Sequence, residues 1–203
     1  NWWLHTNSIW NAVCLAGVTG AALAQLPAVE DRAQFVVAAE RYSRNFLTGF
    51  TPDGYCSEGL GYWNYGFGHY VLLSETIRQA TGGGVDLLAR PEALAPARLG
   101  ANIQIINGVA PAFADCAVGA RPAGWIMYFV NRVLGLGLAG WEEPDLAHAD
   151  GYLFLSALLL FPNAASEATL PPATAGPDLR TWFSDAGVLI CRPAPGSDCR
   201  MGV

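Results

Sequence analysis

Hydrophobic and polar positions alternate with the period of an α-helix along most of the chain. Residues 9–26 carry no charge and are apolar on nearly every side, whereas residues 29–47 are amphipathic. The same period predicts further helices at residues 69–81, 123–138 and 150–161. Between the first two of these, residues 85–88 and 93–106 are predicted to form one or two shorter helices. An uncharged helix beside an amphipathic one is typical of a double layer of helices, in which the inner members are buried on both sides. The pattern therefore predicts a mainly α fold.

The last part of the chain has a different pattern. Residues 163–178 are rich in Ala, Thr and Pro and have no periodicity, which indicates a linker. Residues 188–191 read as a β-strand, but few residues follow in which a partner strand could form. We therefore expect a fragment of a larger protein, with a helical part at 1–165, a linker at 166–180 and the start of a β domain at 181–203.

Composition narrows the classes of function. Of the 203 residues, 52% are hydrophobic and 14% are charged, and the net charge is −6. Disordered chains are rich in charge and poor in apolar residues, so this composition argues against disorder. The 11 basic residues are all Arg and form no cluster, which argues against a nucleic-acid partner.

Residues 9–26 have the nominal length of a membrane span. They contain Asn11, Thr19, Gln25 and two glycines, which favour a helix packed within a protein core over one in a lipid bilayer. The sequence therefore predicts no membrane span.

The five cysteines are odd in number and show no CxxC spacing. This argues against a zinc site and against a small disulfide-stapled scaffold. Cys14 and Cys116 stand among small and apolar residues and are interpreted as buried thiols. We expect no metal and no other cofactor.

Two segments, residues 2–14 and 53–66, combine Trp and Tyr with Asn, His or Glu. Both precede or open a predicted helix, where side chains are available to a cleft. Aromatic rings offer flat apolar faces to sugar rings, and their polar atoms can bind hydroxyl groups. The two segments therefore predict a carbohydrate site.

The motifs in these segments resemble those of the heparinase II/III-like polysaccharide lyases, which include heparin, heparan and alginate lyases. The resemblance is carried by Asn-Trp-Trp at 1–3, Trp-Asn-Ala-Val-Cys at 10–14, Pro-Asp-Gly-Tyr at 52–55 and Glu-Gly-Leu-Gly-Tyr-Trp-Asn-Tyr-Gly at 58–66. Ala-Phe-Ala-Asp-Cys at 112–116 and Trp-Phe-Ser-Asp-Ala-Gly-Val-Leu-Ile-Cys-Arg at 182–192 resemble later landmarks in the same order. The resemblance implies an incomplete (α/α) toroid followed by an antiparallel β-sandwich, an acidic polysaccharide substrate and a periplasmic or secreted location.

The resemblance also implies β-elimination on a uronic acid. A hydrogen-bond donor neutralises the carboxylate, a base removes the C5 proton and an acid protonates the departing O4. Tyr62 matches the catalytic tyrosine, as base, acid or both. Asn7 matches the region of the carboxylate neutraliser, with Asn11 as the alternative, and His5 lies where some relatives have a catalytic His.

The chain departs from the family pattern at Ser8-Ile9, where relatives often carry Asn-Asn or His-Asn before the Trp. A further catalytic His usually comes from the β domain, so a fragment that ends here could lack activity. His148 lies in the helical part and does not match it. The residues expected to bind substrate are Trp3, Trp10, Asn11, Glu58, Trp63 and Tyr65.

Structural interpretations stand beside these roles. Tyr62 and Trp63 could pack between helices, His5 and His69 could be structural, and Glu58 could cap the next helix. Two other functions stay open: a non-catalytic glycan-binding toroid and a uronyl C5-epimerase. The acidic net charge favours alginate-like or other weakly sulfated polymers over heparin. The sequence leaves open the particular polymer, endo or exo action and the oligomeric state.

Overall fold

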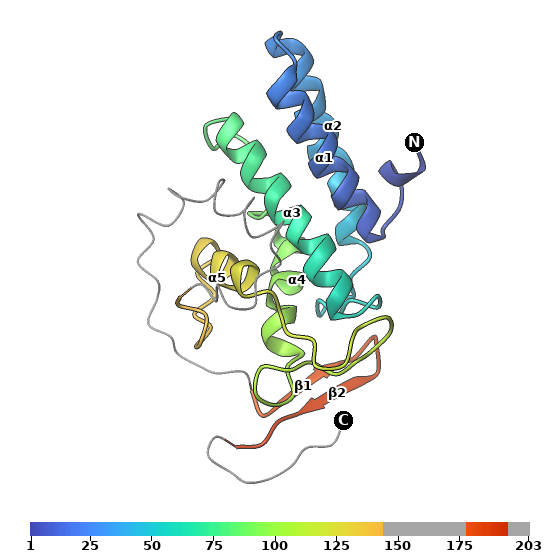
Figure 1. The fold of residues 1–203 in the computed structure, drawn as a ribbon, viewed down its shortest axis with the longest axis vertical. Helices are drawn as coiled ribbons and strands as arrows, with labels where there is room; N and C mark the ends of the chain where they lie inside the picture. Colours follow the sequence, from blue (N-terminus) through green and yellow to red (C-terminus); the bar gives the residue numbers. More distant parts are fainter. Residues whose placement is uncertain (144–177, 195–203) are drawn as a thin grey trace.

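The computed structural model describes residues 1–143 and 178–194, which form a mainly helical fold with a small antiparallel sheet (Figure 1). The predicted mainly α fold is therefore confirmed. The elements, in chain order, are the 3₁₀-helix η1 (Trp2–Leu4), the helices α1 (Ile9–Gln25), α2 (Val29–Leu47), α3 (Leu60–Ala80), α4 (Pro91–Asn102) and α5 (Gly124–Val133), and the strands β1 (Arg180–Phe183) and β2 (Val188–Cys191). The predicted helix at 150–161 and nearly all of the predicted linker lie outside the described residues.

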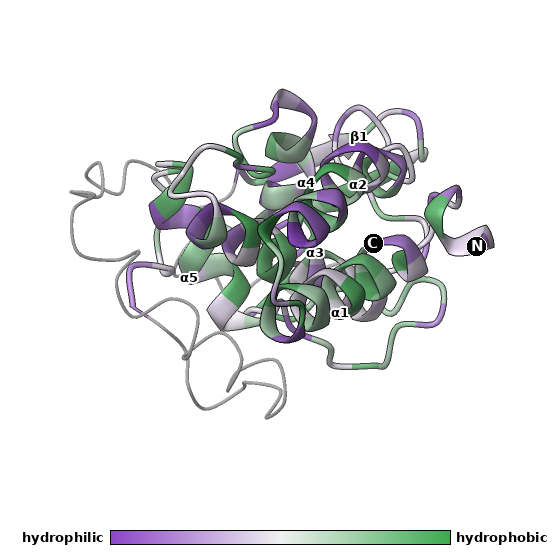
Figure 2. Ribbon diagram, turned by 90° about the horizontal axis from the view of Figure 1, so that it is seen from above, coloured by the Kyte–Doolittle hydropathy of each residue, from purple (hydrophilic) through white to green (hydrophobic). Residues whose placement is uncertain are grey.

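Helices α1 and α2 form an antiparallel pair whose bounds agree closely with the predicted 9–26 and 29–47. Figure 2 shows hydrophobic residues along α1 and more hydrophilic residues on α2. Helix α1 packs against both α2 and α3, yet Trp10 and Val18 on its remaining side are 48% and 40% exposed. Among the described residues, the helix predicted to be buried on both sides is thus packed against two neighbours and leaves part of its surface exposed.

The described part of the chain contains no helix that combines the length and the apolar character needed to cross a membrane.

Helix α3 begins at Leu60, nine residues before the predicted start at residue 69. Glycines in its first turns suggested a loop, but two of them allow close contact between helices. A Cβ on Gly66 would lie 2.6 Å from Cγ2 of Ile9 on α1, and one on Gly68 would lie 3.1 Å from the ring of Trp125 on α5. These glycines are therefore required by packing rather than by a turn.

The core is centred on aromatic rings along the buried face of α3. Trp63, Phe67 and Tyr70 follow one another at helical spacing, and none of their side chains is exposed. The ring centroids of Trp63 and Phe67 lie 5.3 Å apart with nearly parallel planes, and those of Phe67 and Tyr70 lie 5.9 Å apart. Trp63 Nε1 donates to the carbonyl of Pro96 at 2.9 Å, and the Tyr70 hydroxyl donates to the carbonyl of Leu87 at 2.7 Å. The same side chains therefore fill the core and attach α4 and the segment before it.

The helices that follow differ in detail from their predictions. Residues 85–88 form no helix, because the Asp86 side chain accepts hydrogen bonds from the backbone of Leu88 and Ala89 and so closes a turn. Helix α4 begins earlier than residue 93, with Pro91 in its first turn, and ends at Asn102. Helix α5 ends at Val133 rather than at 138. Residues 107–121 form a loop.

Strands β1 and β2 form a hairpin in which Arg180 pairs with Cys191 and Phe183 with Val188. The strand at 188–191 is confirmed, and its partner precedes it rather than being absent. Phe183 is buried, its ring centroid lies 5.3 Å from that of Tyr55, and the backbone N–H of Ser184 donates to Asp53 at 2.7 Å. The hairpin therefore packs directly on a loop of the helical part.

The contact between Gly66 and Ile9 gives a stability test. We expect Gly66→Ala to lower the free energy of unfolding by about 1–3 kcal/mol, because the new methyl overpacks the crossing of α1 and α3. Gly17→Ala is the control, since nothing lies within 4 Å of a Cβ at this helical position. It should raise stability by about 0.5–1 kcal/mol through helix propensity alone. Urea unfolding measures both, and equal effects of the two variants would contradict the assigned packing.

Candidate active site

The two predicted site segments, residues 2–14 and 53–66, meet beside the end of α2 at one end of the helical part. A cavity of about 80 Å³ there is lined by residues from the segment before α1, from the end of α2 and from the loop before α3. The lining residues are Asn7, Ser8, Phe46, Gly49, Phe50, Cys56, Ser57 and Glu58. The structure therefore brings Asn7 and Glu58, which are far apart in the chain, to the same cavity.

The loop that forms one wall of this cavity contains a turn at Thr51-Pro-Asp-Gly54. The backbone of Phe50 pairs with that of Cys56, and the Gly54 N–H donates to the Thr51 carbonyl at 2.8 Å. Gly54 has a φ of +86°, and a Cβ there would lie 2.3 Å from the carbonyl oxygen of Ala95 on α4. Only glycine suits this position, because both its backbone angle and its contact with α4 exclude a side chain.

Asn11 lies in the first turn of α1 and is completely buried. Its Nδ2 donates to the carbonyls of Trp3 and Leu4, each at 3.0 Å. Within the described part of the chain, its Oδ1 is buried without a hydrogen-bond partner. The prediction that Asn11 binds substrate is wrong, because the side chain holds the preceding backbone and has no exposed surface.

The aromatic motif at the start of α3 is divided between two faces of the helix. Tyr62 and Tyr65 are 38% and 42% exposed, whereas Trp63 between them is not exposed at all. The prediction that Trp63 binds substrate is therefore wrong: its ring belongs to the core and its N–H is bound to Pro96. Of the three rings, those of Tyr62 and Tyr65 are available to a ligand.

The position of Tyr62 relative to the cavity follows from helical spacing. Gly66 touches Ile9, the residue that directly follows the cavity residue Ser8. Tyr62 precedes Gly66 by four residues and so lies on the same face of α3, one turn nearer its start. Glu58, in the cavity wall, precedes Tyr62 by a further four residues. Tyr62 is thus on the helix face that approaches the start of α1.

Tyr65 packs against His69 one turn later, with ring centroids 4.6 Å apart in an edge-to-face arrangement. Nδ1 of His69 donates to the Tyr65 carbonyl at 2.7 Å, and His69 is buried. This geometry agrees with the structural interpretation of His69.

The remaining candidates lie on the segment before and at the start of α1. His5, Asn7 and Trp10 are exposed, and Trp3 is half-buried. The imidazole of His5 lies edge-on to the ring of Tyr42 on α2, with centroids 5.4 Å apart. This surface therefore presents an imidazole, a carboxamide and an indole to solvent near the cavity.

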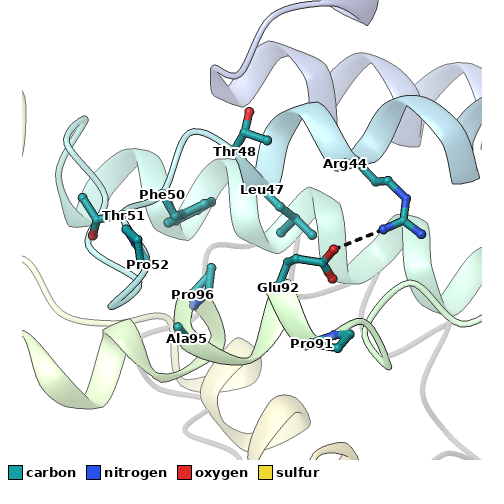
Figure 3. A pocket seen from close by; sticks show the side chains of 10 residues that line it. All are labelled: Arg44, Leu47, Thr48, Phe50, Thr51, Pro52, Pro91, Glu92, Ala95 and Pro96. Carbon is teal, nitrogen blue, oxygen red and sulfur yellow. Dashed lines mark hydrogen bonds and ion pairs between the residues drawn. The ribbon is translucent and has the colours of Figure 1, made fainter. Parts of the chain in front are cut away.

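A larger cavity of about 610 Å³ lies between the end of α2, the loop after it and the start of α4 (Figure 3). Its walls are mainly apolar, and Arg44 and Glu92 form an ion pair across it at 3.3 Å. Both charged side chains are about half exposed, so the pair adds little stability. Phe50 lines this cavity and the smaller one. No pattern in the sequence indicated the larger cavity, because the apolar and proline side chains that line it come from two separate segments.

Within residues 1–143 and 178–194, no three His, Cys, Asp or Glu side chains gather in a way that could hold a metal ion.

Comparison of the chain with protein-family models and with curated protein sequences finds no match. The resemblance of residues 1–14 and 52–66 to polysaccharide lyases therefore stays a prediction from motifs. A function has to be proposed from those motifs together with the geometry of the site.

Because Trp63 is buried and Tyr62 is exposed, substitutions at these two neighbouring positions should differ in their effect on stability. Trp63→Phe should lower the free energy of unfolding by about 1–3 kcal/mol, since it shortens a buried ring and leaves the Pro96 carbonyl without its donor. Tyr62→Phe should change stability by less than about 0.5 kcal/mol, because it alters an exposed group. Urea unfolding of both variants tests the assignment, which a larger loss for Tyr62→Phe would contradict.

Burial raises the pKa of the Cys56 thiol in the cavity wall to about 11. The unfolded thiol ionises near pH 8.5, so its contribution to stability is complete below that pH and is lost as the pH rises through the folded pKa. Between about pH 8 and about pH 10, wild type should therefore lose on the order of 2 kcal/mol more stability than Cys56→Ala. Urea midpoints at the two pH values measure this, and parallel losses in both proteins would show that Cys56 is not the group responsible.

Proposed function

We propose that the chain is part of a heparinase II/III-like polysaccharide lyase that cleaves a uronic acid-containing polysaccharide by β-elimination. The observation that carries the proposal is the meeting of Asn7 and Glu58 at one cavity, with Tyr62 exposed on the adjoining face of α3. The mainly helical fold and its C-terminal hairpin are compatible with an incomplete (α/α) toroid and the start of a β-sandwich, which are part of this proposal.

The exposed side chains can supply the groups that the reaction needs. The Asn7 carboxamide is a neutral donor that can bind the uronate carboxylate and so make the C5 proton more acidic. A base takes that proton, the C5–H electron pair forms the C4–C5 double bond, and the C4–O4 bond breaks. An acid then protonates O4. Tyr62 acts as base, acid or both, with the exposed imidazole of His5 as the second proton-transfer group.

Exposed rings near the cavity suit the flat faces of a polysaccharide. Trp10 is 48% exposed on the first turn of α1, and Tyr65 is 42% exposed on the second turn of α3. Aromatic faces of this kind stack on pyranose rings while their polar atoms bind hydroxyls. We assign Trp3, Trp10 and Tyr65 to substrate binding, and place Glu58 where it can accept hydrogen bonds from the sugar.

The charge of the site supports a substrate with little sulfation. Among the eight described residues that line the small cavity, Glu58 is the only charged one, and it is acidic. A heavily sulfated polymer would need cations at this position. An alginate-like polymer, carrying one carboxylate on each sugar, fits the cavity better, and a periplasmic or secreted enzyme would meet such a polymer.

The test is a lyase assay on the whole natural polypeptide with alginate, heparin and other uronides. The product of β-elimination is an unsaturated uronide whose conjugated double bond absorbs ultraviolet light. Tyr62→Phe should lower kcat by roughly 10²- to 10⁴-fold, the usual contribution of a general acid or base. Tyr65→Phe is the matched control, because it removes the same hydroxyl from a similarly exposed ring and should affect mainly KM.

The two other functions give different results in the same assay. An epimerase would exchange the C5 proton with solvent without forming the absorbing product. A glycan-binding protein would bind the polymer equally well with Tyr62→Phe and form no product. Absence of product on every uronide, or a kcat unchanged by Tyr62→Phe, would refute the proposal, and faster cleavage of heparin than of alginate would refute the substrate preference.

A further inference from the structure

The segment of residues 1–8 is held along one face of α2 and the turn that follows it. Three α2-side residues make the contacts: Tyr42, Asn45 and Gly49, which are spaced by three and four residues and so follow one side of a helix. They contact His5, Leu4 and Asn7 respectively. These three residues thus set the path of residues 1–8, the segment that carries His5 and Asn7 of the proposed site.

The strongest of these contacts is the hydrogen bond of Asn45. Its Nδ2 donates to the Leu4 carbonyl at 2.7 Å, and the same oxygen accepts a second bond from Nδ2 of Asn11 at 3.0 Å. Two carboxamides, one from each of two helices, therefore fix the peptide directly before His5. Since Asn11 belongs to α1 and Asn45 to α2, the bond of Asn45 is the one that ties the segment to α2.

The contact at Gly49 places the other end of the segment. A Cβ on Gly49 would lie 2.1 Å from the carbonyl oxygen of Asn7, so the backbone of Asn7 lies directly against this glycine. Gly49 also lines the small cavity together with Asn7. The segment is thus located between the Asn45 bond at Leu4 and the Gly49 contact at Asn7, with His5 and its Tyr42 contact between them.

We propose that Asn45 is a positioning residue that holds His5 and the cavity residue Asn7 in place along α2. This rests on the proposed function for its catalytic consequence, but the position of the segment can be tested without it. Asn45 touches no substrate: it acts through the Leu4 carbonyl, one residue before His5 and three before Asn7. Loss of its donor releases the segment from α2, while the bonds of Asn11 keep it near α1.

Three variants of Asn45 separate the effect of losing the hydrogen-bond donor from the effect of changing the size of the side chain. Asn45→Ala removes the amide, Asn45→Asp keeps the shape but replaces the donor with a carboxylate, and Asn45→Gln keeps an amide donor on a longer stem. Gln34→Ala is the control, because Gln34 is an exposed amide residue on the same helix.

The first readout is the NMR signal of the His5 imidazole in the 203-residue chain. The chain contains three histidines, so this signal can be assigned by its disappearance in His5→Gln. In wild type the ring of Tyr42, 5.4 Å away, gives it a ring-current shift. This shift should be lost in Asn45→Ala and Asn45→Asp, largely kept in Asn45→Gln, and unchanged in Gln34→Ala.

The second readout is the kinetics of the whole natural polypeptide on the uronide that it cleaves. Asn45→Ala and Asn45→Asp should lower kcat by roughly 10- to 100-fold with little change in KM, because displaced catalytic groups slow the chemical step more than they weaken binding. Asn45→Gln should recover most of the loss.

The outcomes distinguish the two proposals. An unchanged His5 signal in Asn45→Ala, or a lost signal with wild-type kcat, overturns the positioning role. A lost signal together with a lowered kcat that Asn45→Gln restores supports it. If wild type cleaves no uronide, the proposed function fails, and the His5 signal still decides whether Asn45 holds the segment.

Discussion

The structure depends on the stack of aromatic rings along the buried face of α3. Trp63, Phe67 and Tyr70 occupy successive positions on this face, and each ring is fully buried. Their apolar surfaces supply much of the hydrophobic driving force for packing α3 against its neighbours. Two of them also carry a polar atom that would be costly to bury alone, and each donates to a carbonyl, at Pro96 and Leu87. Because burial and hydrogen bonding act through the same side chains, the position of α4 is coupled to the rotation of α3 about its own axis.

That rotation decides which residues of the aromatic motif reach solvent. With Trp63 pointing into the core, the helical period places Tyr62 and Tyr65 on other faces, where both are exposed. The rotation is fixed further by Gly66, which allows Ile9 to approach the α3 backbone. Exposure of Tyr62 is therefore a consequence of core packing rather than a local property of the motif. A tyrosine that projects from a rigid helix is also well suited to hold a fixed position near a ligand.

The elements that could be predicted from the sequence are those whose signals are local in the chain. Helices α1 and α2 were predictable because hydrophobic period and turn residues act locally, whereas the start of α3 was missed because its glycines looked like a loop. Once α3 is known to begin at Leu60, the spacing of Trp63, Phe67 and Tyr70 identifies the buried face from sequence alone. The roles of Asn11 and Asn45 could not be predicted in this way. Both bind backbone carbonyls of residues 3–4, and a carbonyl that lacks a helical or strand partner leaves no mark in a sequence.

The predicted boundary near residue 180 separates two kinds of secondary structure, but packing crosses it. Asp53 accepts a hydrogen bond from the backbone of Ser184, and Tyr55 packs against the buried Phe183. Only a few residues further along the same loop, Cys56 and Glu58 line the small cavity. The loop is therefore supported from the hairpin on one side and contacts the segment of Asn7 on the other. A displacement of the hairpin would have to be transmitted to the cavity through this short stretch of backbone, so the sheet supports the candidate site although it contributes none of the eight residues that line the cavity.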